Sequence, residues 1–388
     1  MWNIPLSDID YGQEEVEAIE RVLKNKWLSM GAEVEKFEVD FSTMMETKHA
    51  IAVSSATAAL HLALLAVGVG TNDEVIQPAL NFVASANMTV ACGASPTFGD
   101  VISLTEPTID PAHVAELITP RVKALIVMHY GGNLCRMVDL YELCKRHKIP
   151  LIEDACHAVG ARYHCKLQQQ LSPSMMAGAI GDIGCFSFFA NKNMTTGEGG
   201  MLVTQNDEVA SKLRLLRSHG MTSLTWQRHL GHARSYEVVA NGYNYRLDEI
   251  HAALGRVQLK KLPANNKRRR DLLRCYRQAI DELDGWAMPF SDSIEDSAGH
   301  LMVAIAPTND ARDQAAERLR NAGIQSSMHY PCISDLRAFL QFSSSRLPVT
   351  REFVSRVITL PLYPAMNEQD VERIFAVLRE RNRIPVMH

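Results

Sequence analysis

Asp154 and Lys192 each follow a short apolar segment of the chain and have side chains that could take part in chemistry. Asp154 comes directly after residues 150–153, which read as a strand. In open α/β sheets, ligands bind beyond the carboxyl ends of the strands, so an acid at this point is a candidate binding residue. Asp is also favoured at helix N-caps, and a helix could begin at Ala155. Both interpretations of Asp154 stay open at this point.

Lys192 stands in a loop whose composition is unusual for a surface lysine. Apolar residues precede it and small residues follow it, in the segment Ser187-Phe-Phe-Ala-Asn-Lys-Asn-Met-Thr-Thr-Gly-Glu-Gly-Gly. A lone loop lysine is usually a solvated charge, but these neighbours indicate a partly desolvated amine near a strand end. Because desolvation lowers the pKa of an amine, Lys192 is a candidate nucleophile that forms a Schiff base.

The segment Ser54-Ser55-Ala56-Thr57 links an apolar strand to an Ala/Leu-rich helix. The first N–H groups of a helix have no partner within the helix and lie at the positive end of its dipole, so this turn could bind a phosphate. Simple capping by Ser54 or Ser55 is the alternative. The turn is not a Walker loop, and no G-x-G-x-x-G follows a strand.

The phosphate turn, Asp154 and Lys192, in this order, match the three requirements of one cofactor. Pyridoxal 5′-phosphate (PLP) needs a group that binds its phosphate, an acid that keeps its pyridine nitrogen protonated and a lysine that forms an imine. Each feature is weak alone. Together they predict a PLP site.

The sequence resembles the DegT/StrS family of sugar aminotransferases over essentially its whole length. The resemblance rests on a set of motifs: Ser54-Ser-Ala-Thr-Ala-Ala-Leu, Asn81-Phe-Val-Ala-Ser-Ala-Asn, His129-Tyr-Gly-Gly, Glu153-Asp-Ala-Cys-His-Ala-Val-Gly, Ser187-Phe…Lys192…Gly197-Glu-Gly-Gly, Gly242-Tyr-Asn-Tyr-Arg-Leu-Asp-Glu, His329-Tyr-Pro and Leu360-Pro-Leu-Tyr-Pro. It implies an α/β fold of fold type I, with a mixed, mostly parallel seven-stranded sheet and a smaller α+β domain.

The resemblance assigns roles to cofactor-binding residues. It implies that Lys192 holds PLP and moves the proton during transamination, and that Asp154 pairs with the pyridine nitrogen. The backbone amides of Ala56 and Thr57, with the hydroxyl of Ser187, are expected to bind the phosphate.

Further roles come from the same resemblance. Asn244 is expected to reach the phosphate of a neighbouring subunit's cofactor, which requires a homodimer with shared sites. Phe82 is expected to stack on the pyridine ring, unless it is simply a core residue. His157 stands where the family usually has Gln near the cofactor's 3-hydroxyl, and it could also be a core histidine. Arg246 and His329 are candidate substrate contacts, with a structural ion pair as the alternative for Arg246.

The implied reaction is transfer of an amino group, with L-glutamate as donor, to a keto-sugar that is most simply a nucleotide-linked 4-keto or 3-keto deoxysugar. Amino sugars of this kind serve cell-surface polysaccharides or secondary metabolites. A keto-cyclitol substrate is an alternative, and so is another PLP reaction, such as dehydration or aldol cleavage. A binding protein that retained the fold is a third hypothesis, which Lys192 itself disfavours.

Short apolar segments alternate with helical ones, which predicts an α/β fold with a mostly parallel sheet. The expected strands are 50–53, 74–77, 94–98, 124–129, 149–153, 185–189 and 201–204. The expected helices are 11–46, 56–66, 81–90, 140–147, 209–218, 248–261 and 266–283. Pro263 predicts a break between the last two, so we expect a large cofactor domain, 1–262, and a small domain, 263–388, with the N-terminal segment able to pack on the latter.

Composition excludes several classes of protein. The formal charge of the 388 residues is −4, without the basic stripe of nucleic-acid-binding proteins. The basic run 267–270 is expected to be a solvated helix face. No segment has the apolar length of a membrane span, and residues 1–10 do not resemble a signal peptide, so we expect a cytoplasmic protein. The cysteines form no Cys-x-x-Cys pair, and no metal site is expected.

Overall fold

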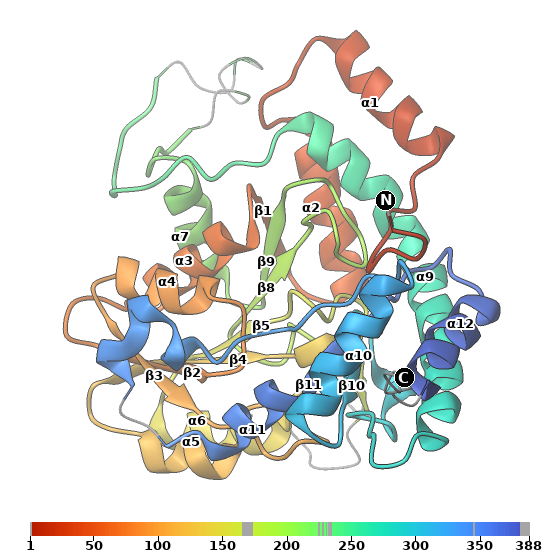
Figure 1. The fold of residues 1–388 in the computed structure, drawn as a ribbon. Helices are drawn as coiled ribbons and strands as arrows, with labels where there is room; N and C mark the ends of the chain where they lie inside the picture. Colours follow the sequence, from red (N-terminus) through yellow and green to blue (C-terminus); the bar gives the residue numbers. More distant parts are fainter. Residues whose placement is uncertain are drawn as a thin grey trace, which may run out of the picture.

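A seven-stranded sheet forms the centre of the protein in the computed structural model (Figure 1), which describes residues 2–164, 174–223, 226, 229, 231, 235–343 and 346–380. The strand order is β1-β9-β8-β5-β4-β2-β3. Only β9 runs antiparallel to its neighbours in this sheet. The strands are β1 (His49–Val53), β2 (Glu74–Pro78), β3 (Ser95–Gly99), β4 (Val122–Met128), β5 (Leu151–Asp154), β8 (Ile183–Ser187) and β9 (Gly200–Thr204). The predicted α/β fold with a mixed, mostly parallel sheet is confirmed.

Helices cover both faces of this sheet (Figure 1), because its central strands are apolar on both sides. In β4, Ala124 and Ile126 join one hydrophobic cluster, whereas Leu125 and Val127 join another on the opposite face. The first face is covered by α3 (Ala56–Ala66), α4 (Ala84–Ala91) and α7 (Asp207–Arg217). The second is covered by α2 (Ala32–Met45), α5 (Pro111–Leu117), α6 (Met137–His147) and α9 (Glu249–Asp281).

The N-terminal region forms two helices, so the prediction of one helix over 11–46 was wrong. Helix α1 (Gln13–Asn25) ends at Lys26, whose φ of 59° places it in the left-handed region. Helix α2 then begins after Gly31. The carboxylate of Glu249 accepts hydrogen bonds from the backbone N–H groups of Gly31 and Val34, at 2.9 and 3.0 Å. A cap from a distant helix therefore starts α2, which local sequence could not indicate.

Helix α9 continues through Pro263, so the predicted break at this proline was wrong. A proline inside a helix removes one backbone hydrogen bond and strains the preceding turn. Here the helix packs on both sides of the proline, with Leu262 buried in the sheet domain and Leu272 buried in the C-terminal cluster. We propose that the two domains meet along α9, so that the division between 1–262 and 263–388 falls inside one helix.

The C-terminal unit has its own core around an antiparallel pair of strands, β10 (Met302–Ile305) and β11 (Val357–Leu360). Ile4 belongs to this core and forms a bridge with Ile324, so the N-terminal segment packs on the C-terminal unit. The remaining elements are the strand pair β6 (Arg162–His164) and β7 (Ser174–Met176), helices α10 (Asn309–Asn321), α11 (Pro348–Arg356) and α12 (Glu368–Arg379), and short 3₁₀ turns η1 (Tyr130–Gly132), η2 (Ile294–Asp296), η3 (Ile333–Asp335) and η4 (Arg337–Phe342).

The basic run 267–270 is largely a structural feature, and its interpretation as a solvated face was wrong for its arginines. Arg268, Arg269 and Arg270 donate hydrogen bonds to the backbone carbonyls of Met366, Leu362 and Ser297, at 2.6, 2.7 and 3.1 Å. Burial lowers the pKa of Arg269 to about 10. These contacts attach α9 to two loops of the C-terminal unit.

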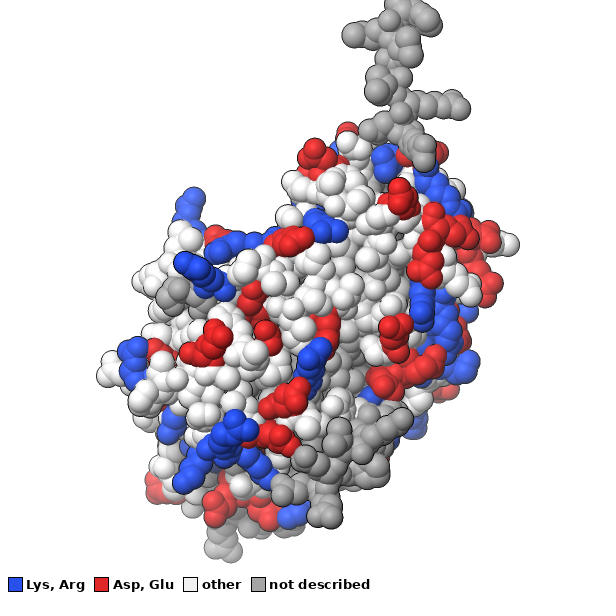
Figure 2. Space-filling model, turned by 90° about the horizontal axis from the view of Figure 1, so that it is seen from below, with Lys and Arg blue, Asp and Glu red and all other residues white. Residues whose placement is uncertain are grey.

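The surface carries charges of both signs. On the face in Figure 2, acidic and basic side chains occur in small mixed groups rather than in one extended basic band. Within the part of the chain that the structure describes, none of the helices combines the length and apolar character needed to cross a membrane.

Asp100 generates a prediction about stability. Directly after β3, its carboxylate accepts hydrogen bonds from the N–H groups of Val349 and Thr350, at 3.0 and 2.7 Å, and from the Thr350 hydroxyl at 2.6 Å. It thereby caps α11, whose own N-cap residue, Leu347, has no side-chain oxygen. We expect Asp100→Ala to lower the free energy of unfolding by about 2–3 kcal/mol in urea denaturation, because buried donors lose their acceptor.

The matched control is Asp110→Ala, which removes the side-chain cap of α5, whose oxygen accepts from the Ala112 N–H at 2.9 Å. We expect a loss of about 1 kcal/mol there. Equal losses in the two variants would contradict the idea that Asp100 joins the sheet to the C-terminal unit.

Candidate active site

The main cavity lies at the carboxyl ends of β5 and β8 and at the start of α3, and its volume is about 320 Å³. It brings together most of the residues predicted from the sequence. Those that line it are Ala56, Thr57, Phe82, Asp154, His157, Ser187, Lys192 and His329. Asn244 and Arg246 are outside its lining.

Asp154 is the last residue of β5 and is only 4% exposed. Its Oδ2 accepts a hydrogen bond from Asn81 Nδ2 at 3.3 Å, and its Oδ1 accepts one from the N–H of Cys156 at 3.3 Å. Residues 155–160 form turns, so the alternative that Asp154 caps a helix was wrong. Among the described residues, no Lys, Arg or His forms an ion pair with Asp154, which leaves this buried carboxylate ready for a cationic ligand group.

Lys192 projects from the loop after β8 into the same cavity. Desolvation lowers the pKa of its amine below the usual value, although the neighbouring Cys156 and Asp154 act in the opposite direction. A lower pKa increases the share of neutral amine, which is the nucleophilic form. The structure thus places an activated amine and a cation-seeking carboxylate in one cavity.

The first turn of α3 closes the cavity on another side. Ser55 is the N-cap residue, and its hydroxyl accepts from the N–H of Ala58 at 3.1 Å. The N–H groups of Ala56 and Thr57 precede any intrahelical partner and are available for an anion. Gly200, at the start of β9, permits this arrangement, because a Cβ there would lie 2.5 Å from the carbonyl carbon of Ser55. Ser187 lines the cavity beside this turn.

The aromatic side chains of His157, His329 and Tyr330 also line the cavity. His157 Nε2 lies 2.8 Å from the Tyr330 hydroxyl, and the N–H of Gly131 donates to His157 Nδ1 at 3.4 Å. Burial, with the nearby charges of Lys192 and His329, lowers the pKa of His157 well below the usual value. Burial and the charge of Lys192 likewise lower the pKa of His329 to about 4. Both histidines are therefore neutral at physiological pH, and the carboxylate and amine dominate the charge of the site.

Phe82 is 55% exposed at the mouth of the cavity, so the alternative that it is a core residue was wrong. Its ring centroid is 5.8 Å from that of Tyr330. An exposed aromatic ring beside a cavity has a free face on which a planar ligand can stack.

Asn244 and Arg246 lie on a segment beside the edge strand β1. Asn244 is exposed and forms a bridge with Ser218, and Arg246 forms one with Val53. The Nη1 atom of Arg246 is buried and has no hydrogen-bond partner among the described residues. Burial and the charge of Arg217 lower the pKa of Arg246. The intramolecular ion pair considered for Arg246 is not formed within the described part of the chain.

The sequence interpretation assigned no role to several residues of the site. Asn81 holds Asp154, Tyr330 contacts His157, and Glu198, Asn191 and Cys156 line the cavity. Each stands within or beside one of the motifs on which the family resemblance rests, so closeness to those motifs was the only indication of a role in the site. What local sequence could not indicate is which of these side chains face the cavity.

The chemical groups that surround the cavity are suited to bind PLP. A buried carboxylate without a cationic partner, an amine of lowered pKa and a helix start with unpartnered N–H groups surround one cavity. These groups match the pyridine nitrogen, the carbonyl carbon and the phosphate of PLP. Together with the sheet they define a PLP-dependent transferase.

Comparison with known proteins specifies the class further. Residues 10–379 match the DegT/DnrJ/EryC1/StrS aminotransferase family, and the chain belongs to this family. It is 36% identical over 378 residues to the spore coat polysaccharide biosynthesis protein SpsC of Bacillus subtilis, covering 95% of this chain and 94% of SpsC. The protein is therefore a PLP-dependent aminotransferase.

Solved structures agree with this assignment. PseC of Helicobacter pylori, an aminotransferase involved in the biosynthesis of pseudoaminic acid, has a TM-score of 0.87 and 28% identity, over 97% of this chain and 98% of PseC. Spr1654 of Streptococcus pneumoniae in its PMP form has a TM-score of 0.88 and 27% identity, over 97% and 98%. Its structure is also known in a PLP form.

The contact between Asn81 and Asp154 generates a prediction. We expect Asn81→Ala to lower kcat/KM by about tenfold, because the carboxylate is no longer held in one orientation. The measurement is steady-state transamination together with the PLP dissociation constant. The control is Asn87→Ala, an exposed position in helix α4, which begins shortly after Asn81, and we expect this variant to be neutral. Wild-type kinetics in Asn81→Ala would mean that this contact does not orient Asp154.

Proposed function

We propose that the protein transfers an amino group from L-glutamate to a nucleotide-linked keto-deoxysugar, with Lys192 and Asp154 as its catalytic residues. The observation that carries this proposal is the cavity in which Lys192, Asp154 and the first turn of α3 meet. Family membership supports a sugar substrate, and so do the roles of SpsC in spore coat polysaccharide biosynthesis and of PseC in pseudoaminic acid biosynthesis.

The catalytic roles follow from the positions of the side chains. Bound PLP supplies an electron sink for the electron pair that a substrate carbon releases when it loses a proton. Lys192, whose lowered pKa increases the share of neutral amine, would attach the cofactor, and its freed amine would later accept and return that proton. Asp154, oriented by Asn81 and the Cys156 N–H, keeps the proton on the pyridine nitrogen.

Other residues bind and orient. The N–H groups of Ala56 and Thr57, with the Ser187 hydroxyl, hold the phosphate, and Phe82 stacks on the ring. His157, neutral and hydrogen-bonded to Tyr330, stands where the 3-hydroxyl of the cofactor is expected. His329 is positioned to contact the substrate at the cavity wall.

The same cofactor residues would serve a keto-cyclitol substrate, or a dehydration or aldol cleavage. Formation of 2-oxoglutarate from glutamate distinguishes transamination from the last two reactions. The position of the keto group on the ring distinguishes the sugar substrates. We keep the nucleotide-linked sugar as the proposal because SpsC and PseC both belong to the biosynthesis of saccharides. The cytoplasm stays the predicted location.

The active enzyme is proposed to be a homodimer in which Asn244 completes the site of the neighbouring subunit. Asn244 is exposed and lies outside the cavity of its own chain, so it is free to act in a second one. The unpartnered Nη1 of Arg246 on the same segment is a second group that a neighbouring copy or its substrate could satisfy.

The role of Lys192 has a direct test. The purified protein is expected to absorb in the visible range with PLP, and L-glutamate is expected to bleach this band while 2-oxoglutarate accumulates. Lys192→Ala is expected to lose the band and to retain less than about one thousandth of the activity, because the amine both attaches the cofactor and moves the proton. Circular dichroism verifies that this variant is folded. More than trace transamination by Lys192→Ala would overturn the assignment.

The shared site has a complementation test. Asn244→Ala and Lys192→Ala homodimers are both expected to be nearly inactive. After the two variants are mixed and allowed to exchange subunits, about one quarter of wild-type activity is expected, because half of the dimers are mixed and each contains one intact site. Asn241→Ala, a neighbouring exposed position, is the control and is expected to be active on its own. No recovery on verified exchange would contradict a site shared through Asn244.

A further inference from the structure

Lys192 has a neighbour behind the cavity wall that the proposed mechanism does not use. The Nε2 atom of His300 lies 3.4 Å from Lys192 Nζ. His300 belongs to the segment before β10, in the C-terminal unit, and is 5% exposed. It is not among the residues that line the cavity, so it touches the lysine without facing the substrate.

A series of hydrogen bonds determines which His300 nitrogen carries the proton. Asn266 Nδ2 donates to the carbonyl of Val159 at 2.9 Å, so Asn266 Oδ1 is the acceptor that faces Asn193. Asn193 Nδ2 donates to this oxygen and to the carbonyl of Ala298, both at 2.8 Å. Because carbonyl oxygens only accept, the orientation of both amides is unambiguous.

The orientation of Asn193 in turn sets the tautomer of His300. Asn193 Oδ1 lies 2.9 Å from His300 Nδ1, so Nδ1 must carry a hydrogen and donate it. In a neutral imidazole the other nitrogen is then an acceptor only. His300 Nε2 therefore presents its lone pair to Lys192, and the lysine amine must donate a hydrogen to it.

The surroundings keep His300 neutral. Burial is the main cause that lowers its pKa well below the usual value, and the charges of Lys192 and Arg269 act in the same direction, as those of His157 and His329 would if these histidines were protonated. His157 packs against it with ring centroids 4.2 Å apart. Burial also lowers the pKa of the neighbouring Lys192, while Cys156 and Asp154 act in the opposite direction.

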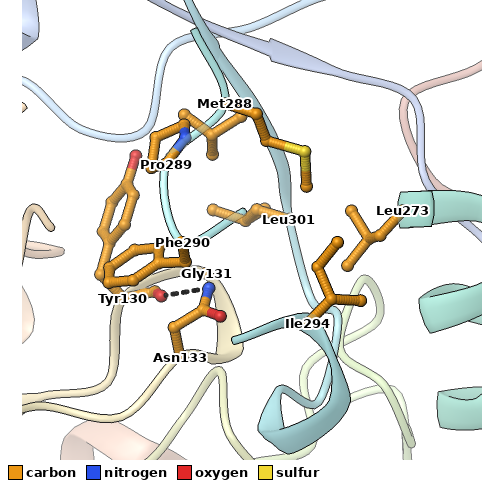
Figure 3. Close-up of a pocket in the computed structure, with 10 residues that line it drawn as sticks. Tyr130, Gly131, Asn133, Leu273, Met288, Pro289, Phe290, Ile294 and Leu301 are labelled. Carbon is orange, nitrogen blue, oxygen red and sulfur yellow. Dashed lines mark hydrogen bonds between the residues drawn. The ribbon is translucent and has the colours of Figure 1, made fainter. Parts of the chain in front are cut away.

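The segment that carries His300 is attached to the large domain. The N–H groups of Ala298 and His300 donate to the carbonyls of Gly132 and Gly131, each at 3.0 Å. Gly132 has a φ of +97°, and a Cβ there would come within 3.0 Å of the His300 nitrogen. In Figure 3, Leu301, the next residue, lies close to Gly131, and both residues line a small cavity. The backbone hydrogen bonds of this segment and the side chain of Asn193 thus both hold the His300 imidazole in place.

We propose that His300 is a positioning residue for Lys192: its Nε2, oriented by Asn193 and Asn266, accepts a hydrogen from the amine and directs the lone pair of the amine into the cavity. The inference rests on the proposed role of Lys192. A neutral amine has one lone pair, so fixing one N–H restricts where this lone pair points. The C-terminal unit thereby takes part in activating the lysine.

Two substitutions of His300 separate this role from packing. His300→Asn keeps a polar group near Nδ1 and removes the acceptor at Nε2. His300→Gln extends its amide oxygen toward the position of Nε2 and is the rescue variant. The measurement is the rate at which cofactor-free full-length protein takes up PLP, followed by absorbance as a function of pH, with thermal unfolding to verify that both variants fold.

We expect His300→Asn to reduce the limiting uptake rate at high pH by about tenfold or more, because the amine is no longer oriented. The midpoint of the pH profile should also move down, because the ammonium form loses an acceptor while the amine stays desolvated. His300→Gln should recover most of the rate and return the midpoint toward that of the wild type.

Three results would overturn the inference. One is an unchanged rate and midpoint in His300→Asn. A second is a midpoint that moves up, since that is expected if the substitution only loosens the pocket and admits water. The third is equal loss in both variants. Failure of the wild-type protein to take up PLP would instead contradict the proposed function, so the two failures are distinguishable.

Discussion

Burial of the Lys192 amine beside Asp154 is the constraint on which the arrangement of the site depends. An ammonium group is costly to remove from water, and its pKa falls when it is desolvated. The site supplies one carboxylate at the end of β5, held by Asn81, and keeps the surrounding histidines neutral. The charge of each side chain near the amine therefore affects the pKa of the amine. A cofactor with a ring nitrogen and a phosphate satisfies the groups that the protein itself leaves without partners.

The sheet places these groups together. Because β5 and β8 run parallel, their carboxyl ends meet at one edge, and Asp154 and Ser187 lie there side by side with the start of α3. The single reversed strand, β9, brings Gly200 back against Ser55, where only a glycine fits. Close contact between β9 and the first turn of α3 is thus a geometric condition for the proposed anion site.

Helix α9 connects the two halves of the molecule mechanically. Its first part is buried against the sheet domain, and its later part belongs to the C-terminal core. Asn266 and the three arginines that follow Lys267 bond to loops of both parts, including Val159 and Leu362. The same helix therefore supports the Asn193–His300 contact behind Lys192.

The local sequence by itself determined the alternation of strands and helices, the identity of Asp154 and Lys192 as chemical groups, and the helix start at Ala56, since each depends on neighbouring residues. Tertiary structure decided the rest. Pro263 stays inside helix α9 because packing of the helix before and after the proline outweighs the hydrogen bond that the proline removes. Helix α2 begins after Gly31 because the carboxylate of Glu249, far along the chain, accepts a hydrogen bond from the Gly31 N–H. Asn81, Tyr330 and His300 reach the site only after the chain has folded, because contacts between distant segments leave no periodic or local pattern in the sequence.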